Sequence, residues 1–494
     1  MNWELFVLIL YFVAMLGIGV YFFIKAKSKS DKDYFLGGKS MGPWVSAMSA
    51  QASDMSAWLL MGLPGSILAF GLGQAWIGIG LAIGTALNWI IVAKRLRRFS
   101  EAAGDAITLP QYLSNRFVTK SKTLQVACAV VFLVCFTLYV ASAFVAGTSV
   151  FTSLFDIKES TAMIIFAAIL IVYTFLGGYK AVCWTDFFQG LLMLAAVLAV
   201  PIIIVITKDL DFAILDNVVT STGGKEFSFT ASLFSAPPAE IVSGLAWGLG
   251  YFGMPHILVR FMAIKKPSMV KKSAIVAIVW VVLALTAVIF IAVFGRIIVG
   301  DELLAGENQS LVFVRLARLL FPAAISGILL SAIIAASMST ADSQLLVASS
   351  SFTSDIYKPL IRKEASDKEV LWVGRGVVLI IAVIAYFIAS SGSSIMDLVE
   401  NAWAGFGSSF GSVIILSLFW RRFTYKGALA GVIAGALTDV LWYIFLATPT
   451  GIYEIIPGFA VSMIAAVVTT LLDKEPAKEV TDIFDKATAP IVEE

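Results

Sequence analysis

Residues 43–68 read PWVSAMSAQASDMSAWLLMGLPGSIL, a segment long enough to cross a bilayer as a helix but interrupted by polar residues, glycines and a proline. A second segment, residues 239–258, reads AEIVSGLAWGLGYFGMPHIL and is interrupted by glycines and a proline. Breaking a helix inside a bilayer frees backbone N–H and C=O groups, which is tolerable only where they line a cavity or bind something. The two interruptions therefore predict a binding site built from two broken membrane helices.

The composition of the whole chain agrees with a membrane protein. Of its 494 residues 59% are hydrophobic and only 14% are charged, so too little polar surface exists to cover a soluble globule. The net charge of +2 gives no reason to expect nucleic acid as a partner. We expect an all-α polytopic fold of about 13 helices. The apolar spans lie near residues 4–24, 43–68, 73–93, 123–150, 160–178, 187–207, 239–258, 274–299, 320–348, 370–390, 398–420, 427–447 and 451–472.

The basic residues predict an orientation. If the N-terminus is outside, 29 of the 35 lysines and arginines fall on the cytoplasmic side, as the positive-inside rule requires. We therefore expect a multi-pass protein of the plasma (inner) membrane with its C-terminus in the cytoplasm. Residues 473–494 form a short charged tail, which we expect to be mostly disordered because Pro476 and Pro490 punctuate it.

Thirteen spans divide into an extra first helix at 4–24, five-helix units at 43–207 and 239–420, and two last helices at 427–472. Because five is odd, the two units must lie in opposite orientations, which is the inverted-repeat plan of many secondary transporters. The broken segments are the first helices of the two units. Residues 1–472 are accordingly expected to form a single transmembrane transporter domain.

Asp54 is the most informative residue of the first broken segment. A carboxylate inside an apolar span costs about 2.5 kcal/mol or more, and a cation or a polar partner should offset that cost. One interpretation is an acid that bonds to neighbouring hydroxyls and braces the broken helix. The other is that Asp54 attracts or helps to hold a monovalent cation, with the freed carbonyls of Ala52 and Met55 as ligands.

Residues 335–343, AASMSTADS, supply more oxygen atoms. A hydroxyl in a membrane helix often only bonds back to the carbonyl four residues earlier. Ser339 and Thr340 lie beside small alanines, however, and small residues let another backbone approach closely. A set of oxygen ligands suits Na⁺ and argues against a transition metal.

Trp247, Tyr251 and Pro255 are spaced at i, i+4 and i+8, which predicts one helix face. Such aromatic stripes are often packing or an interfacial belt, but this one coincides with the glycine interruptions and so favours a small-molecule pocket. Tyr139 is a weaker candidate for the same pocket. Asp186 is either a solvated loop acid or an acid that faces the inner vestibule.

Nothing in the sequence predicts an enzyme. Residues 248–253 match G-x-G-x-x-G, but they lie in an apolar span and follow no strand, so they are not a dinucleotide fingerprint. The sequence carries no P-loop either. Transport must then draw on an ion gradient or run downhill.

In these residues the chain resembles the sodium/solute symporter family, and within it the members that carry proline. Several matching stretches follow one another in a single order along nearly the whole chain. They are residues 33–38 (DYFLGG), 52–56 (ASDMS), 58–62 (WLLMG), 247–253 (WGLGYFG), 255–257 (PHI), 329–333 (LLSAI), 402–407 (AWAGFG) and 453–459 (YEIIPGF).

The resemblance implies a leucine-transporter-type fold, alternating access and Na⁺ as the coupling ion. It implies that Asp186 lies on the ion path and that Asp54 supports Na⁺ binding. The family members that carry proline usually have glycine where this chain has Ala57, so the added methyl could narrow the pocket; Asp342 adds an acid near the ion site. The implied Na⁺ ligands are Ala52, Met55, Ala336, Ser339 and Thr340, and the implied substrate residues are Ser56, Tyr139, Trp247, Tyr251 and Pro255, beside Ala57.

Three functions remain open at this point. The first is Na⁺-coupled uptake of L-proline across the lipid bilayer, without an obligatory protein partner. The second is a Na⁺ symporter for another small solute, such as a different amino acid, a carboxylate or a sugar. The third is a membrane sensor without net transport, which would need an output domain that the roughly 20-residue tail does not provide.

Overall fold

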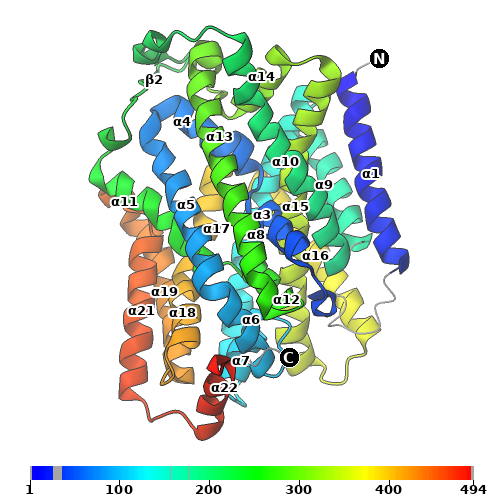
Figure 1. Ribbon diagram of the computed structural model, residues 1–494, viewed down its shortest axis with the longest axis vertical. Coiled ribbons are helices and arrows are strands. Elements are labelled where there is room, and N and C mark those ends of the chain that lie inside the picture. Colours follow the sequence, from blue (N-terminus) through cyan, green and yellow to red (C-terminus); the bar gives the residue numbers. More distant parts are fainter. Residues whose placement is uncertain (1–2, 26–35, 156, 177, 491–494) are drawn as a thin grey trace.

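Long helices that run along one axis of the molecule make up most of the protein (Figure 1). The computed structural model describes residues 3–25, 36–155, 157–176 and 178–490. Short 3₁₀ or π segments, labelled η, join or continue several helices. The elements of the first half are α1 Trp3–Lys25, η1 Gly37–Lys39, α3 Pro43–Asp54, η2 Trp58–Gly62, α4 Leu63–Phe70, η3 Leu72–Gln74, α5 Ala75–Leu87, η4 Asn88–Val92, α6 Ala93–Ala102, α7 Leu109–Arg116, α8 Thr123–Phe155, α9 Glu159–Leu176 and α10 Tyr179–Thr207.

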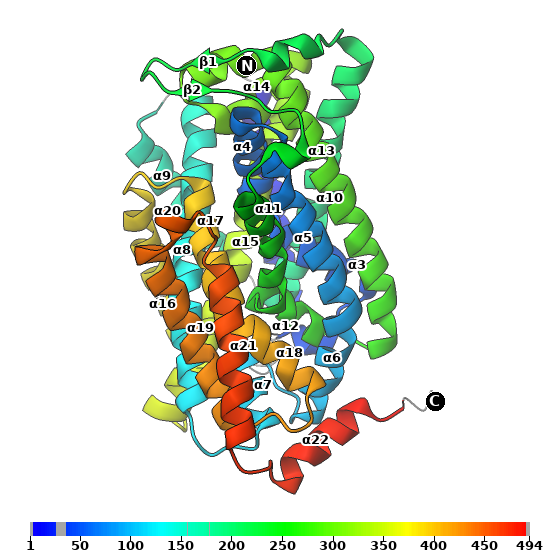
Figure 2. The same ribbon diagram turned by 90° about the vertical axis from the view of Figure 1, so that its left-hand side faces the viewer.

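The second half contains a small antiparallel pair of strands, which lies at the end of the molecule where the chain begins (Figure 2). The elements are η5 Phe212–Asp216, β1 Val219–Thr220, β2 Glu226–Phe227, η6 Leu233–Ser235, α11 Pro238–Ala246, η7 Trp247–Phe252, α12 Pro255–Ala263, η8 Pro267–Met269, α13 Val270–Ala305, η9 Gln309–Leu311, α14 Val312–Leu320, α15 Ala323–Ser351, η10 Phe352–Ile361, α16 Asp367–Ala389, α17 Ile395–Phe406, η11 Gly407–Gly411, α18 Ser412–Phe419, α19 Tyr425–Phe445, α20 Ala447–Thr450, α21 Ile455–Leu472 and α22 Lys478–Thr488.

All the expected spans fall on helices, but the expected number of 13 is not confirmed. Among the described residues ten helices are long and apolar enough to cross a membrane, or eleven if the bent pair Pro238–Phe252 and Pro255–Ala263 is one span. The apolar segments Trp58–Phe70 and Glu159–Phe175 are too short to qualify alone. The first of them continues α3 across the interruption that the sequence predicts.

Helix starts follow the local sequence. Pro43, Pro238 and Pro255 occupy first-turn positions, where a missing N–H costs nothing. Ser394 and Asp397 form a capping box at the start of α17, each side chain accepting the other residue's backbone N–H. These local signals place both broken spans and the helix that packs against them.

The core lies along α15 and the α17–α18 span. In their most apolar windows 78% and 83% of the residues are buried, against 22% for α1 and 28% for both α19 and α21. Large apolar side chains such as Val134, Ile380 and Phe387 remain exposed on the outside of the bundle, where a bilayer would cover them. The polar residues of α15 therefore face protein and not lipid.

Glycines allow α5 to touch the second broken span. A Cβ on Gly84 would lie 2.4 Å from the carbonyl oxygen of Gly248, and one on Gly80 would lie 2.4 Å from that of Gly244. No side chain fits at such distances, so the two backbones are in direct contact, as in small-residue packing of membrane helices. This contact fixes the position of η7 relative to α5.

The expectation of a mostly disordered tail is wrong. The tail does not stay without structure, because α22 forms there and buries Val480, Phe484 and Ala487 on one face. Arg116 holds it by donating to the Val480 carbonyl at 2.9 Å, and Arg421 pairs with Asp485 at 2.8 Å. The prolines mark the ends of this segment and do not prevent a helix between them. Figure 2 shows α22 at the end of the molecule opposite the strands.

Candidate ion and solute site

The first broken span opens between α3 and η2. Met55, which follows Asp54, leaves helical geometry at φ −81° and ψ 77°, and its N–H donates to the Gln51 carbonyl at 2.9 Å. The Ser56 N–H turns back to the Asp54 carbonyl at 3.0 Å. The chain is helical again from Trp58. The helix is thus interrupted within the protein interior, and the carbonyls of Ala52 and Asp54 accept hydrogen bonds from side chains.

The second broken span bends by 43° between η7 and α12. The expected α-helical stripe of Trp247, Tyr251 and Pro255 is not kept, because η7 is a 3₁₀ helix with three residues per turn and the chain breaks at Gly253 and Met254. Trp247 and Tyr251 nevertheless both contact the Trp403 ring, with centroids 6.0 and 5.1 Å apart. The residues meet through a shared neighbour and not through a common helix face.

Four of the five predicted ion ligands lie together. The Ser339 hydroxyl donates to the Ala52 carbonyl at 2.7 Å and lies 3.3 Å from the Ala336 carbonyl. The Thr340 hydroxyl approaches the same Ala52 oxygen at 3.4 Å. Met55 lies three residues further along the same break. Two carbonyls and two hydroxyls form an all-oxygen set, the donor type that a hard cation such as Na⁺ prefers.

Asp54 is fully buried beside this set. The Tyr251 hydroxyl donates to its Oδ2 at 2.6 Å, while its Oδ1 accepts no hydrogen bond from the described residues. The Asp54 carbonyl receives the Tyr139 hydroxyl and the Trp58 indole N–H, each at 3.3 Å. The Asp54 carboxylate therefore joins the two broken spans and, among the described residues, accepts no hydrogen bond from the hydroxyls of the neighbouring serines. A buried carboxylate oxygen without a partner fits a nearby cation.

Aromatic rings cover this region. Trp247 lies against Trp403 and against Tyr453, with centroids 6.0 and 5.2 Å apart and planes tilted by 34° and 31°. The Trp403 indole N–H donates to the Trp247 carbonyl at 2.7 Å, which satisfies a backbone group of η7. The Asn88 amide does the same for the Tyr251 carbonyl at 2.9 Å. The 3₁₀ segment is thus held by side chains of α17 and η4.

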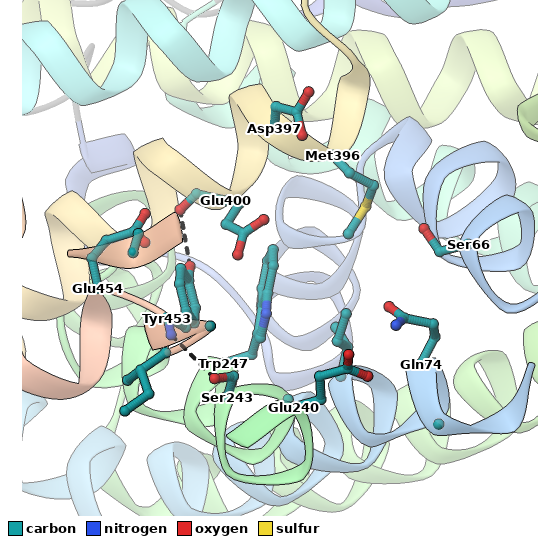
Figure 3. A pocket seen from close by; sticks show the side chains of 16 residues that line it. Ser66, Gln74, Glu240, Ser243, Trp247, Met396, Asp397, Glu400, Tyr453 and Glu454 are labelled. Atoms are coloured by element: carbon teal, nitrogen blue, oxygen red, sulfur yellow. Dashed lines mark hydrogen bonds between the residues drawn. The ribbon is translucent and has the colours of Figure 1, made fainter. Parts of the chain in front are cut away.

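A cavity of about 390 Å³ leads down to Trp247 (Figure 3). Segments of α4, α5, α11, α17 and the α20–α21 connection surround it. Of the six predicted substrate residues, Trp247 lines this cavity. The other five, Ser56, Ala57, Tyr139, Tyr251 and Pro255, are all buried around the breaks.

Asp186 belongs to α10 and lies against α3. It is fully buried, and its Oδ2 accepts from Ser49 at 2.6 Å, from Ser53 at 3.0 Å and from Arg260 at 3.1 Å. The interpretation as a solvated loop acid is therefore wrong, because α10 carries Asp186 into the interior. Arg260 also donates to Ser343 at 2.5 Å. Since Ser53 follows Ala52 and Ser343 follows Thr340 by three residues, this network borders the predicted ion ligands directly.

Several residues of this region were not singled out by sequence reasoning. Ser49, Ser53 and Ser343 join the Asp186 network, a role that the sequence did not predict. Asp342, which the sequence places near the ion site, has both side-chain oxygens buried without a partner among the described residues. Trp403 and Tyr453 lie in stretches that carry the family resemblance, so a signal for them existed. No sequence signal pointed to Asn88, because a single amide in an apolar helix does not reveal which backbone carbonyl it bonds.

Two broken helices, an all-oxygen ligand set and an aromatic-covered cavity define a secondary transporter that couples solute movement to a cation. The sequence profile of the sodium:solute symporter family matches residues 34–435. The chain belongs to the sodium:solute symporter family. It is thus a multi-pass membrane transporter and not an enzyme, and Na⁺ is its coupling ion.

Relatives agree with this assignment, and a solved structure shares the fold. The sodium/proline symporter of Haemophilus influenzae is 44% identical, with 97% of this chain and 96% of the relative covered. That of Escherichia coli is 43% identical, with 97% and 95% covered. The structure of a Na⁺-coupled sialic acid symporter in a substrate-bound outward-open state matches with a TM-score of 0.77 at 21% identity, covering 96% of this chain and 99% of that one. The structural likeness concerns the fold.

Proposed function

We propose that this protein imports L-proline together with Na⁺ by alternating access, across the plasma membrane, with its N-terminus outside and its C-terminus in the cytoplasm. The observation that carries the proposal is the position of Asp54. It lies two residues from the Ala52 ion ligand and is bonded to Tyr251 of the solute region. Ion and solute would therefore contact opposite sides of one break.

The present hydrogen bonds of the proposed ion ligands indicate how these residues would bind Na⁺. Ser339 and Thr340 now direct their hydroxyls at the Ala52 carbonyl. A Na⁺ ion between these atoms would turn each hydroxyl oxygen into a ligand, with the Ala336 carbonyl and, we propose, the Met55 carbonyl completing the set. Because the ligands come from α3 and α15, binding would tie the two helices together.

The solute region follows from the same break. We propose that Ser56, Ala57 and Pro255 contact proline, with Tyr139, Trp247 and Tyr251 closing the site from the outer side. A bound ion holds Ala52 and Met55 in place, and so presents Ser56 and Ala57 in one geometry to the solute. Asp186 and its arginine partner would receive the ion on the inner side. Linked binding of this kind is what a symporter requires.

The substrate is assigned from the relatives, whose names specify proline, and from the matching residues. Another small solute remains the second candidate, because the methyl group of Ala57 is buried at the break and would narrow the pocket there. Purified protein in proteoliposomes should accumulate labelled L-proline only with an inward Na⁺ gradient. Unlabelled competitors decide the range: if another amino acid, a carboxylate or a sugar blocks uptake better than proline, the substrate assignment is wrong.

We further propose that residues 43–207 and 239–420 are inverted five-helix repeats within a single transporter domain at 1–472. Both units begin with a broken span, at α3–η2–α4 and at α11–η7–α12. The extra helix α1 and the last helices α19 and α21 lie outside the two units.

A further inference from the structure

The cavity above Trp247 carries four acids. Glu240 on α11, Asp397 and Glu400 on α17 and Glu454 before α21 line it, and none of its described lining residues is basic. Glu240 and Asp397 are exposed at the rim, Glu400 is half-buried, and Glu454 is only 4% exposed. Figure 3 shows the carboxylates of Glu400 and Glu454 on either side of the Tyr453 phenol. Carboxyl groups therefore continue from the rim to the depth of the cavity.

Glu454 is the residue that points to a ligand. Its Oε1 is buried and has no hydrogen-bond partner among the described residues. The Tyr453 hydroxyl beside it donates to the Glu400 carbonyl at 2.9 Å and not to either carboxylate. Asp439 of α19 lies near enough to influence Glu454 electrostatically, but it is another acid and its Oδ1 is bonded to Ser408. A buried carboxylate among acids needs either a cation or a proton.

We propose that this cavity is an outer cation site that holds a partly hydrated Na⁺ ion, between Glu400 and Glu454, before the ion reaches Ala52. A partly hydrated monovalent ion is favoured over a divalent one, because within the described residues no group of three acids, histidines or cysteines is arranged to hold a metal ion directly. Clefts lined by charge of one sign raise the local concentration of counter-ions about 10- to 1000-fold. The inference assumes the proposed orientation, in which this end of the molecule faces outward.

The pH dependence of Na⁺ binding supplies an independent readout of this site. Burial raises the pKa of Glu454 to about 7. As the pH falls through about 7, Glu454 takes up a proton and the site loses part of its attraction for cations. The groups that face it are Glu400 and Asp397 on α17, Glu240 on α11, Asp439 on α19 and the neighbouring Tyr453, so no basic group in the described surroundings compensates.

Initial uptake rates at varied external Na⁺ and constant ionic strength test the proposal. Glu400→Gln and Glu454→Gln keep the shape of the side chain, and together they should raise the half-saturating Na⁺ concentration about tenfold, the lower end of the expected range. Saturating Na⁺ should restore most of the rate. Asp301→Asn, which removes an exposed acid that does not line the cavity, is the matched control and should leave the Na⁺ dependence unchanged. In the wild-type protein acidification from pH 8 to pH 6 should raise the half-saturating Na⁺ concentration, and Glu400→Gln together with Glu454→Gln should flatten that response.

Unchanged half-saturating Na⁺ in the double variant overturns the proposal. A loss of proline affinity that persists at saturating Na⁺ also overturns it, because the solute's ammonium group would then be the occupant. Equilibrium binding of radioactive Na⁺ without proline separates this inference from the proposed function. In an Asp54→Asn background, which weakens the deeper site, a low-affinity component should remain and should disappear with Glu400→Gln and Glu454→Gln. Absence of that component contradicts the outer site even if proline transport is confirmed.

Discussion

At the scale of single residues, the two sides of the break in the first span have different chemistry. Towards α3 lies Ala52, whose carbonyl meets two hydroxyls of α15; towards η2 lie Ser56 and Ala57, which are buried next to aromatic rings. Asp54 stands between them and reaches Tyr251. Substitutions on the two sides should therefore produce different kinetic defects, although fewer than six residues separate them.

Asp54→Asn should raise the half-saturating Na⁺ concentration by about 10- to 100-fold, the effect typical of removing a supporting group around a metal site. Uptake at ordinary Na⁺ concentrations should then nearly vanish while expression stays normal. The matched control is Tyr251→Phe, which removes only the hydrogen bond to Oδ2 and should have a smaller effect. Uptake with wild-type Na⁺ dependence in Asp54→Asn would mean that Asp54 only braces the helix.

Thr340→Ala and Trp247→Ala should separate ion binding from solute binding. If Na⁺ raises proline affinity through a coupling energy of about 1–3 kcal/mol, proline must raise Na⁺ affinity by the same factor. Thr340→Ala should therefore lower apparent proline affinity at low Na⁺, with recovery at saturating Na⁺. Trp247→Ala should lower it at every Na⁺ concentration. Equilibrium binding in detergent, titrating each ligand at several concentrations of the other, measures both; a Thr340→Ala defect that saturating Na⁺ does not relieve would place Thr340 in the solute pocket.

At the scale of elements, hydropathy and breaker residues were enough to place the apolar helices and both interruptions, although the expected number of 13 membrane spans is not confirmed. Apolar length determines whether a helix can span, and glycine, proline and polar residues mark where it breaks. Ala52, Ser339 and Thr340 were proposed as oxygen ligands from the residues themselves, and the family resemblance added Ala336; the hydrogen bond between Tyr251 and Asp54 was not foreseen. What the sequence did not reveal were contacts between distant elements, such as Asn88 with Tyr251 or Arg260 with Asp186. Single polar residues in apolar helices carry no local pattern that names their partners.

The sequence of α22 contains a helix pattern, but its composition argued for disorder. Val480, Phe484 and Ala487 are spaced at i, i+4 and i+7, which is typical of a helix with one apolar face. The charged composition and the flanking prolines favoured disorder instead. The structure docks this face on α6, where the Phe484 ring meets Phe99 edge to face at 5.3 Å. Local composition is thus a poor guide where a short amphipathic helix has a surface to bind.

Phe484→Ala should release α22 more than Asp485→Asn does. Removing a buried phenylalanine side chain costs about 3 kcal/mol, at the lower end of the usual range, whereas water and salt screen the exposed Arg421–Asp485 pair. Arg421 lowers the pKa of Asp485, so the pair stabilises docking above the unfolded-state pKa and loses that effect as the pH falls through the lower folded-state value. The extent of α22 docking should therefore be the same at pH 6 and pH 8. Trypsin cleavage at Lys478 and Lys486 measures release; faster cleavage in Asp485→Asn than in Phe484→Ala would contradict this ranking.

At the scale of the whole molecule, the two ends differ in charge. The cavity above Trp247 is lined by four acids and by no described base, whereas α22 and the arginines that bind it lie at the opposite end. Basic residues are retained on the cytoplasmic side during insertion, and acids have little influence on orientation. In the proposed orientation this asymmetry would also serve transport, because an acidic cavity on the outer side would attract the ion whose gradient drives uptake.

Cysteine labelling tests this orientation, on which both the direction of transport and the outer cation site depend. The three native cysteines, Cys128, Cys135 and Cys183, are buried, so background labelling should be low. Cysteines at the exposed positions Lys208 and Lys266 report on the two sides. In intact cells an impermeant maleimide should label Lys208→Cys and not Lys266→Cys, and permeabilised cells, as the control, should label both. The reverse pattern would turn Glu400 and Glu454 towards the cytoplasm, where Na⁺ is kept low, and an acidic cavity there would hinder release of the ion instead of assisting its capture.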